Sequence, residues 1–374
     1  MLKYKKKALF FYDYWLLVIT GVLLATGLLM VASASMVISD RIYHTSFHFV
    51  FHQLTYIGIG IFLSFIIVRV PLSFWKDIGP YLLIISLFLL VVVLLPGIGK
   101  EVNGSVRWLG VGPFRIQVSE LAKFSIIVFL SGYLIRRKEE VQTSFKGFIK
   151  PILILIMLGV LLLLEPDFGA LAVIMFTSLG MMFLAGANLR QFILLMLIVA
   201  GGLTLLAITS PYRMLRLTTF LHPWANQFDS GYQLTQSLIA FGRGGIFGVG
   251  LGNSIQKLFY LPEAHTDFLF AVLMEELGFV GGFIVIVLFA ALVGRILIIG
   301  RIAYKKANFF AAYLAYGLGL WIGFQAMVNI GVNAGILPTK GLTLPFISYG
   351  GSSMLFYCIA TAVLLRIYYE VMLD

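Results

Sequence analysis

Long apolar runs recur ten times along this chain of 374 residues, and this feature constrains the fold more than any other. About 20 apolar residues cross the hydrocarbon of a bilayer as a helix, and a backbone in lipid must satisfy its own hydrogen bonds. We therefore expect an all-α polytopic membrane protein with about ten transmembrane helices. The runs lie near 14–37, 49–68, 79–95, 117–135, 151–164, 170–186, 192–208, 268–294, 308–330 and 350–366.

The composition agrees with this class, since 60% of the residues are hydrophobic and only 11% are charged. The net charge of +11 would suggest a nucleic-acid partner in a soluble protein. Here most Lys and Arg residues fall in short loops on one side of the ten spans, where they set the topology. Both termini are therefore predicted to be cytoplasmic, and no nucleic-acid role is expected.

One transmembrane domain is predicted over residues 1–374. Residues 1–13 form a basic cytoplasmic tail, and the run that follows is too long for a cleaved signal peptide, so it is interpreted as a retained first span. The segment 209–266, between the seventh and eighth spans, is the largest outer loop. Within it Leu234, Leu238 and Phe241 repeat at helical spacing, which predicts a helix at the membrane surface or re-entering it.

Two charged groups near the fourth span could carry chemistry. In QVSELAKF, Glu120 and Lys123 stand three residues apart on one helical face and can pair. The pair either holds helices together or forms a charged wall of a substrate site, because charges at membrane depth face the bundle interior or a cavity. Just before them, Arg107 and Trp108 lie on an outer loop, where such residues usually anchor a protein at the interface.

The stretch YLPEAHTDFLFAVLMEELG places Glu263, His265 and Asp267 at the entrance of the eighth span. Thr266 or Asp267 could simply cap that helix, since both are good N-cap residues. The alternative is the chemical centre of a membrane enzyme. Asp167, in the short outer hairpin EPDFG, is most simply a turn acid.

Motifs for common cofactors are missing from the sequence. The five histidines show no HExxH pattern, and there is no P-loop, no GxGxxG and no GxSxG. The single Cys358 supports neither a disulfide framework nor a cysteine metal site. We therefore expect no metal site built by the protein and no use of ATP.

Four long motifs together resemble one family over nearly the whole chain: NGSVRWLGVGPFRIQVSELAK, HPWANQFDSGYQLTQSLIAFGRGG, LPEAHTDFLFAVLMEELG and GILPTKGLTLPFISYGGSS. This family is SEDS (shape, elongation, division and sporulation), the bacterial peptidoglycan polymerases. The stretches LPTKGLTLPFISYGGSS and YLPEAHTDF are more similar to its division branch, FtsW, than to its elongation branch, RodA.

The resemblance implies roles for particular residues. Asp267 matches the essential outer-face aspartate of the family, and Glu120 with Lys123 matches its paired charges in the fourth span. Arg107 and Trp108 fall on the first large outer loop of the family. The chain departs from the family pattern at three positions, where no catalytic role is assigned: Val118, Glu165 and Phe259.

The reaction implied is polymerisation of lipid II at the outer face of the cytoplasmic membrane. Asp267 would act as the base, and Lys123, Arg107 and Arg243 would face the phosphates, in a cavity between spans four, seven and eight. His265, Glu120 and Trp108 complete the expected substrate-binding set. No covalently bound cofactor is expected, although a divalent cation, Mg²⁺ or Mn²⁺, can accompany the substrate diphosphate.

The same resemblance implies membrane partners at the division septum. A class B penicillin-binding protein is expected as the cross-linking transpeptidase, beside other divisome membrane proteins. Spans eight and nine and the loop 209–266 are the expected contact surface, because small residues there allow close helix packing. A lipid II flippase and a scaffold that recruits a synthase are the alternatives, and a secondary transporter is a more distant one because no inverted repeat is found.

Overall fold

The computed structural model describes residues 12–102, 105–111, 114–187, 189–208, 214, 220–338 and 341–373. Every predicted span coincides with a helix. The ten helices are α2 (Tyr14–Tyr43), α3 (His48–Ile67), α4 (Leu72–Val93), α5 (Val118–Arg136), α7 (Phe145–Leu164), α8 (Phe168–Leu184), α9 (Leu189–Ile208), α12 (Leu269–Lys305), α13 (Phe309–Asn333) and α14 (Gly351–Leu373).

Seven of these helices, namely α2, α3, α4, α5, α12, α13 and α14, are long and apolar enough to cross a membrane. Several extend beyond the predicted spans: α4 begins seven residues earlier, at Leu72, and α12 continues to Lys305. Hydropathy locates only the part of a helix inside the hydrocarbon. The helical hydrogen bonds continue past that boundary into the head-group region.

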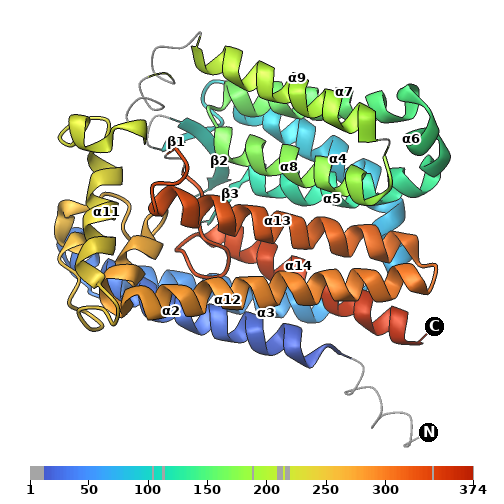
Figure 1. Cartoon of the computed structure of the whole chain (residues 1–374). Coiled ribbons are helices and arrows are strands. Elements are labelled where there is room, and N and C mark those ends of the chain that lie inside the picture. The colour runs from blue at the N-terminus through green and yellow to red at the C-terminus, as the bar shows by residue number, and fades with distance from the viewer. Residues whose placement is uncertain are drawn as a thin grey trace, which may run out of the picture.

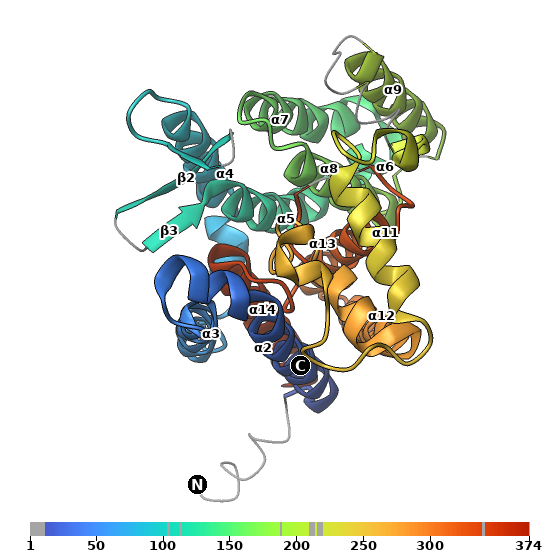
Figure 2. The same ribbon diagram turned by 90° about the vertical axis from the view of Figure 1, so that its left-hand side faces the viewer.

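The bundle is arranged around α5 and α13, which lie near its centre in the end-on view (Figure 2). The apolar part of α5 is 83% buried, whereas that of α3 is only 11% buried. Large apolar side chains on the peripheral helices are correspondingly exposed, for example Phe62 on α3 and Phe88 on α4. This pattern fits a bundle whose peripheral helices contact lipid.

Both described chain ends lie at one end of the bundle (Figure 1). Tyr12 stacks on Tyr369, with ring centroids 5.4 Å apart. Asp13 caps α2 by accepting a hydrogen bond from the Leu16 amide at 2.8 Å, and it also accepts one from Arg295 Nε at 2.7 Å. The positive-inside prediction makes this the cytoplasmic end, so we refer to the opposite end as the outer end.

A small antiparallel sheet at the outer end was not predicted from the sequence (Figure 1). It consists of β1 (Lys100–Val102), β2 (Ser105–Val111) and β3 (Phe114–Gln117), in the order β1-β2-β3. Trp108 in its middle strand pairs with Gln117 of β3. The sheet leads directly into α5 and brings β2 against the turn between α7 and α8.

The outer loop contains the predicted helix, α11 (Tyr232–Gly244), preceded by the 3₁₀ turn η2 (Pro223–Asn226) and followed by a short helical segment, η3 (Gln256–Tyr260). Much of the beginning of this loop, residues 209–213 and 215–219, lies outside the described residues. Helix α11 packs against α12. The described part of the loop therefore covers the outer end of the eighth span.

Helix α12 is interrupted at Gly278, which has a φ of 68° and a ψ of −168°. The loop crosses the helix at this point, since a Cβ on Gly278 would stand 2.3 Å from the Gly248 amide nitrogen. The amides of Phe279 and Val280 donate to the carbonyls of Gly245 (2.9 Å) and Ile246 (3.1 Å). The glycines after α11 thus allow two backbones to meet closely.

A second irregular segment, residues 341–350, enters the bundle from the outer end. Leu344, Phe346 and Ile347 in it are at most 1% exposed, and a Cβ on Gly27 in α2 would stand 2.5 Å from the Phe346 carbonyl oxygen. Non-helical backbone at membrane depth is tolerated only where protein groups satisfy it. One such group is Gln53, which donates to the Ser348 carbonyl at 3.3 Å.

Candidate active site

Asp267 lies in the turn that precedes α12, and its backbone is held by two asparagines of α13. Asn329 Nδ2 and Asn333 Nδ2 donate to its carbonyl oxygen at 2.8 and 2.9 Å. Asn333 also accepts a hydrogen bond from the Ala271 amide at 3.0 Å. The backbone at Asp267 is therefore fixed from the neighbouring helix, independently of its carboxylate.

The sequence left open whether Thr266 or Asp267 caps α12, and the structure shows that neither does. The cap position is Phe268, which makes no side-chain cap. Thr266 Oγ1 instead donates to the Glu263 carboxylate at 2.6 Å. Among the described residues, the Asp267 carboxylate has no hydrogen-bond partner, so it is available for a substrate.

The surroundings of Asp267 place its titration near neutrality. Burial, reinforced by the negative charges of Glu263 and Asp167, raises the pKa of Asp267 to about 7, and Arg107 opposes the rise. A Cβ on Gly341 would stand 2.9 Å from Asp267 Oδ2, so a larger residue there would crowd the carboxylate. A carboxylate with a pKa near the working pH is suited to general-base catalysis.

Arg107 on β2 reaches over the turn between α7 and α8. Its Nε donates to the Glu165 carbonyl at 3.2 Å and its Nη2 to the Pro166 carbonyl at 2.6 Å. A guanidinium carries five N–H donors, so these two bonds leave others for a ligand. Arg107 therefore acts electrostatically on Asp267, although the two residues are 160 positions apart in the sequence.

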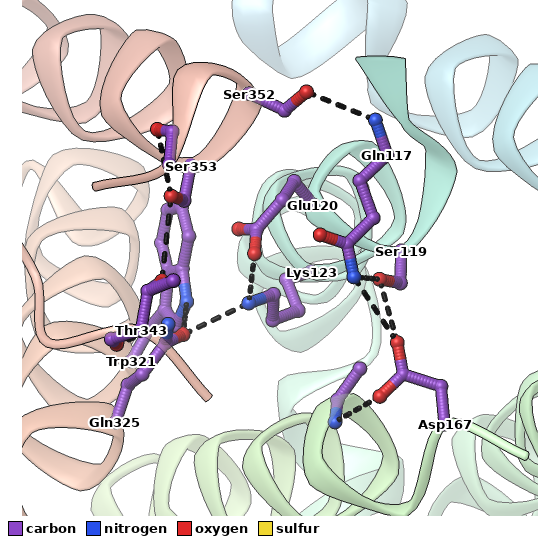
Figure 3. A network of polar contacts seen from close by, with 12 residues as sticks. Gln117, Ser119, Glu120, Lys123, Asp167, Trp321, Gln325, Thr343, Ser352 and Ser353 are labelled. Atoms are coloured by element: carbon purple, nitrogen blue, oxygen red, sulfur yellow. Dashed lines mark hydrogen bonds and ion pairs between the residues drawn. The ribbon is translucent and has the colours of Figure 1, made fainter. Parts of the chain in front are cut away.

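Asp167 is the N-cap of α8, which agrees with its interpretation as a turn acid. Its Oδ1 accepts from the Ala170 amide at 3.1 Å, and its Oδ2 accepts from Ser119 Oγ at 3.0 Å and from Gln117 Nε2 at 3.4 Å (Figure 3). These bonds join the α7–α8 turn to the start of α5. They also hold a negative charge close enough to influence Asp267.

The predicted pair of Glu120 and Lys123 is present, with 2.8 Å between Lys123 Nζ and Glu120 Oε1. Lys123 is 1% exposed and also donates to Gln325 Oε1 at 2.8 Å, beneath the ring of Trp321 (Figure 3). Gln325 in turn donates to the Thr343 carbonyl at 3.1 Å. The pair is part of a buried network, and its role toward a substrate stays a prediction.

A polar stripe on α13 connects this network to Asp267. Gln325, Asn329 and Asn333 follow one another at four-residue spacing and therefore share one helical face. Besides holding Asp267, Asn329 donates to the Leu342 carbonyl at 2.6 Å. The stripe thus supports the entering segment 341–350 and Asp267 together. Sequence reasoning missed it, although three amides at this spacing in an apolar helix were a usable signal.

The other predicted substrate residues have different surroundings. Arg243, in the last turn of α11, forms an ion pair with the buried Glu275, at 3.4 Å between Nε and Oε1. His265 is 9% exposed and packs against the rings of Phe49 (4.6 Å) and Tyr349 (5.7 Å). Burial lowers the pKa of His265, partly offset by Glu263, which favours a neutral imidazole. Their substrate roles stay predictions.

Trp108 is half-buried on β2 beside Arg107. Successive side chains of a strand point to opposite faces, so Trp108 faces away from the turn that Arg107 contacts. The expected cavity between α5, α9 and α12 depends on α9, many of whose side chains lie outside the described residues. That cavity and the role of Trp108 also stay predictions.

Comparison with known proteins identifies the family. The family model for cell cycle proteins of the FtsW, RodA and SpoVE type matches residues 14–372. This chain belongs to that family. Two curated relatives are both named probable peptidoglycan glycosyltransferase FtsW. The one from Coxiella burnetii is 59% identical over 359 residues, which cover 96% of each chain. The one from Legionella pneumophila is 58% identical and covers 96% of this chain and 91% of its own.

Solved structures share the fold of this FtsW-type chain. One match has a TM-score of 0.80 and 26% identity and covers 97% of this chain and 99% of its own. It comes from work on the structural coordination of polymerization and crosslinking by a peptidoglycan synthase complex. Rod shape determining protein RodA from Thermus thermophilus matches with a TM-score of 0.72 and 26% identity, covering 97% and 98%. The predicted resemblance to the SEDS family is confirmed.

Proposed function

We propose that this FtsW-family chain is a peptidoglycan glycosyltransferase that polymerises lipid II at the outer face of the cytoplasmic membrane during septal wall synthesis. The names of its relatives support the reaction class. The outer position of Asp267, Arg107 and Asp167 supports the side on which it acts. Polyprenyl-linked substrates also suit a site at the outer end of a lipid-embedded bundle.

The observation that carries the proposal is the state of Asp267. Its backbone is fixed by Asn329 and Asn333, its carboxylate is not used for capping, and burial with nearby acids raises its pKa to about 7. A purely structural aspartate would be bonded through its carboxylate, as Asp167 is. Asp267 therefore has the properties expected of a base.

In the proposed reaction, the 4-hydroxyl of the acceptor GlcNAc attacks C1 of the donor MurNAc. A C–O bond forms at C1 while the bond to the diphosphate breaks, and undecaprenyl diphosphate leaves with the bonding electron pair. Asp267 accepts the hydroxyl proton as the bond forms. Arg107 faces the developing negative charge of the diphosphate with donors that its two backbone contacts leave free.

A divalent cation accompanying the diphosphate would need ligands. Among the described residues, no three His, Cys, Asp or Glu side chains converge to hold a metal ion. The described residues therefore do not form a dedicated cation site. Any such ion would depend mainly on substrate oxygens.

The test is to purify Asp267→Asn and measure glycan polymer formed from lipid II. Asparagine keeps the shape of the side chain and removes the base, so the rate should fall by a factor on the order of 10²–10⁴. The variant should be at least as stable as wild type at neutral pH, because a buried carboxyl with a pKa raised to about 7 destabilises the fold as it ionises. Asp40→Asn, which alters an exposed acid at the outer end of α2, is the matched control. Wild-type polymer yield from a folded Asp267→Asn protein would remove the proposed base.

The same variant separates the proposal from a flippase or a scaffold. Neither alternative breaks a bond, so either should tolerate Asp267→Asn far better than an enzyme does. Lipid II transport or synthase recruitment that persists in Asp267→Asn, together with a wild-type protein that forms no polymer, would favour the alternatives instead.

The partner we propose is a class B penicillin-binding protein, which would cross-link the strands, together with other divisome membrane proteins. One structural match comes from work on a peptidoglycan synthase complex. On α12, Phe279 and Phe283 are 59% and 54% exposed and offer an apolar surface to a neighbouring helix. Photo-crosslinking along residues 279–294 and 220–266 should give adducts with the synthase, and the absence of adducts from both segments would overturn this surface.

A further inference from the structure

Two cavities follow one another along the seam between the outer parts of α4 and α7, and together we call them the groove. Its lower part has a volume of about 600 Å³ and is lined on facing sides by Leu87 and Val91 of α4 and by Val160 and Leu161 of α7. Its upper part, of about 450 Å³, is lined by residues one turn further out along the same two helices, including Leu94, Leu95 and Leu164.

The groove ends at the proposed site. Val106 and Pro166 line its upper part. Arg107 follows Val106 on β2 and donates to the Pro166 carbonyl at 2.6 Å. The guanidinium is thus bonded to a residue of the groove wall. The upper part of the groove therefore ends beside a cation.

The length of the groove corresponds to one leaflet. From Ile84 to Val93, the last residue of α4, the rise is roughly 14 Å, and from Met157 to Leu164 on α7 it is roughly 10 Å, at about 1.5 Å per residue. Half of the hydrocarbon thickness is about 15 Å. A chain lying in the groove would therefore run from near the bilayer centre to the level of Arg107.

We propose that this groove binds the polyprenyl tail of the diphosphate-linked donor and thereby sets the diphosphate at Arg107. The inference rests on the proposed function. Its basis is the combination of an apolar lining in the lower part, a length of about one leaflet, and a cation that is bonded to Pro166 in the wall of the upper part. Lipid tails are as apolar as leucine side chains, so a tail gains little binding free energy by moving from the bilayer into the groove. The groove therefore contributes mainly by positioning the reacting carbon of the donor.

Filling the groove should therefore slow the reaction of long-tailed substrates. In Val91→Trp and Val160→Trp, kcat/KM for full-length lipid II should fall by a factor on the order of ten, the scale of lost positioning. Each variant has a control on the same helix with similar exposure but outside the groove. Ile85 (48% exposed) matches Val91 (47%), and Ile156 (54%) matches Val160 (51%).

Tail length is the decisive variable. A lipid II analogue with a short farnesyl tail cannot fill the groove, so wild type and groove variants should process it at equal rates. Equal losses in the groove variants and their controls would overturn the inference. So would equal losses on both substrates, because the tryptophans would then act through the bundle and not through the tail.

A binding experiment separates this inference from the proposed function. In nanodiscs, a photoreactive polyprenyl diphosphate should label α4 and α7 and be displaced by unlabelled polyprenyl diphosphate but not by excess phosphatidylglycerol. Labelling without any polymerase activity would keep the groove and reject the function. Active protein that shows no labelling, or labelling displaced equally by phosphatidylglycerol, would leave an ordinary lipid contact and reject the groove.

Discussion

Replacing Glu165 with glutamine is expected to stabilise this protein at neutral and alkaline pH. Glu165 is the first residue of the α7–α8 turn, and its side chain is fully buried. Among the described residues neither carboxyl oxygen has a hydrogen-bond partner. Burial, strengthened by Asp167 and opposed by Arg107, raises its pKa from the ordinary value of 4.5 to about 8.

The size of the effect follows from this pKa. The folded protein keeps the proton on Glu165 up to about pH 8, whereas the unfolded chain releases it near 4.5. The folded state then binds more protons between these values, so the free energy of unfolding falls as pH rises through the window. At about 1.4 kcal/mol per unit, Glu165 costs roughly 3 kcal/mol at pH 7 and about 5 kcal/mol above pH 8.

The assay compares thermal unfolding of wild type and Glu165→Gln from pH 5.5 to 8.5. Glutamine cannot ionise, so the variant should unfold at a higher temperature. The difference should be smallest at pH 5.5, where Glu165 costs about 1.4 kcal/mol, and should grow as pH rises. Glu139→Gln, at an exposed position of α6 (Lys138–Thr143), is the control for a general loss of negative charge. Parallel curves for wild type and Glu165→Gln would refute the reasoning, because they would mean that Glu165 titrates normally in the fold.

Three further outcomes follow from the site. With Asp267 as a base of pKa about 7, kcat/KM should fall about tenfold per unit below pH 7, and a profile without an inflection there would contradict the role. Either Glu120→Ala or Lys123→Ala should destabilise the protein by roughly 3–5 kcal/mol because one buried charge loses its partner. The double variant Glu120→Leu with Lys123→Met should regain thermal stability. Loss of polymer formation in this stable variant would place Lys123 at the substrate, and full polymer yield would exclude that role. Asn333→Ala should cost about 1–3 kcal/mol and lower kcat more than it changes KM, and unchanged kcat would show that Asp267 needs no such support.

The spans were predictable because their signal is local. A run of about 20 apolar residues has few structural options in a bilayer, so each predicted span became a helix. The sheet before α5 was not predictable in the same way. Its strands are three to seven residues long, carry no clear alternation, and are stabilised by pairing with each other and by contact with α4 and α5.

Contacts between residues that are close in sequence could be predicted. Glu120 and Lys123 share a helical face, and the predicted ion pair is present. The proximity of Arg107 to the α7–α8 turn depends on the fold of the sheet. The pairing of Arg243 with Glu275 depends on how the loop crosses α12 at Gly278. Neither contact leaves a signal in the spacing of residues.

The buried amides of α13 explain how the chain can keep irregular backbone next to Asp267, the proposed base. The entering segment 341–350 and the turn at Asp267 both expose carbonyls inside a bundle from which water is largely excluded, and each such group is costly when unpaired. Gln325, Asn329 and Asn333 satisfy these carbonyls from one helical face. Because the same stripe contacts Lys123 at one end and Asp267 at the other, a shift of α13 along its axis would move both groups together. The spacing of Gln325 and Asn329 along this single helix therefore holds the buried ion pair and the proposed base at a fixed separation.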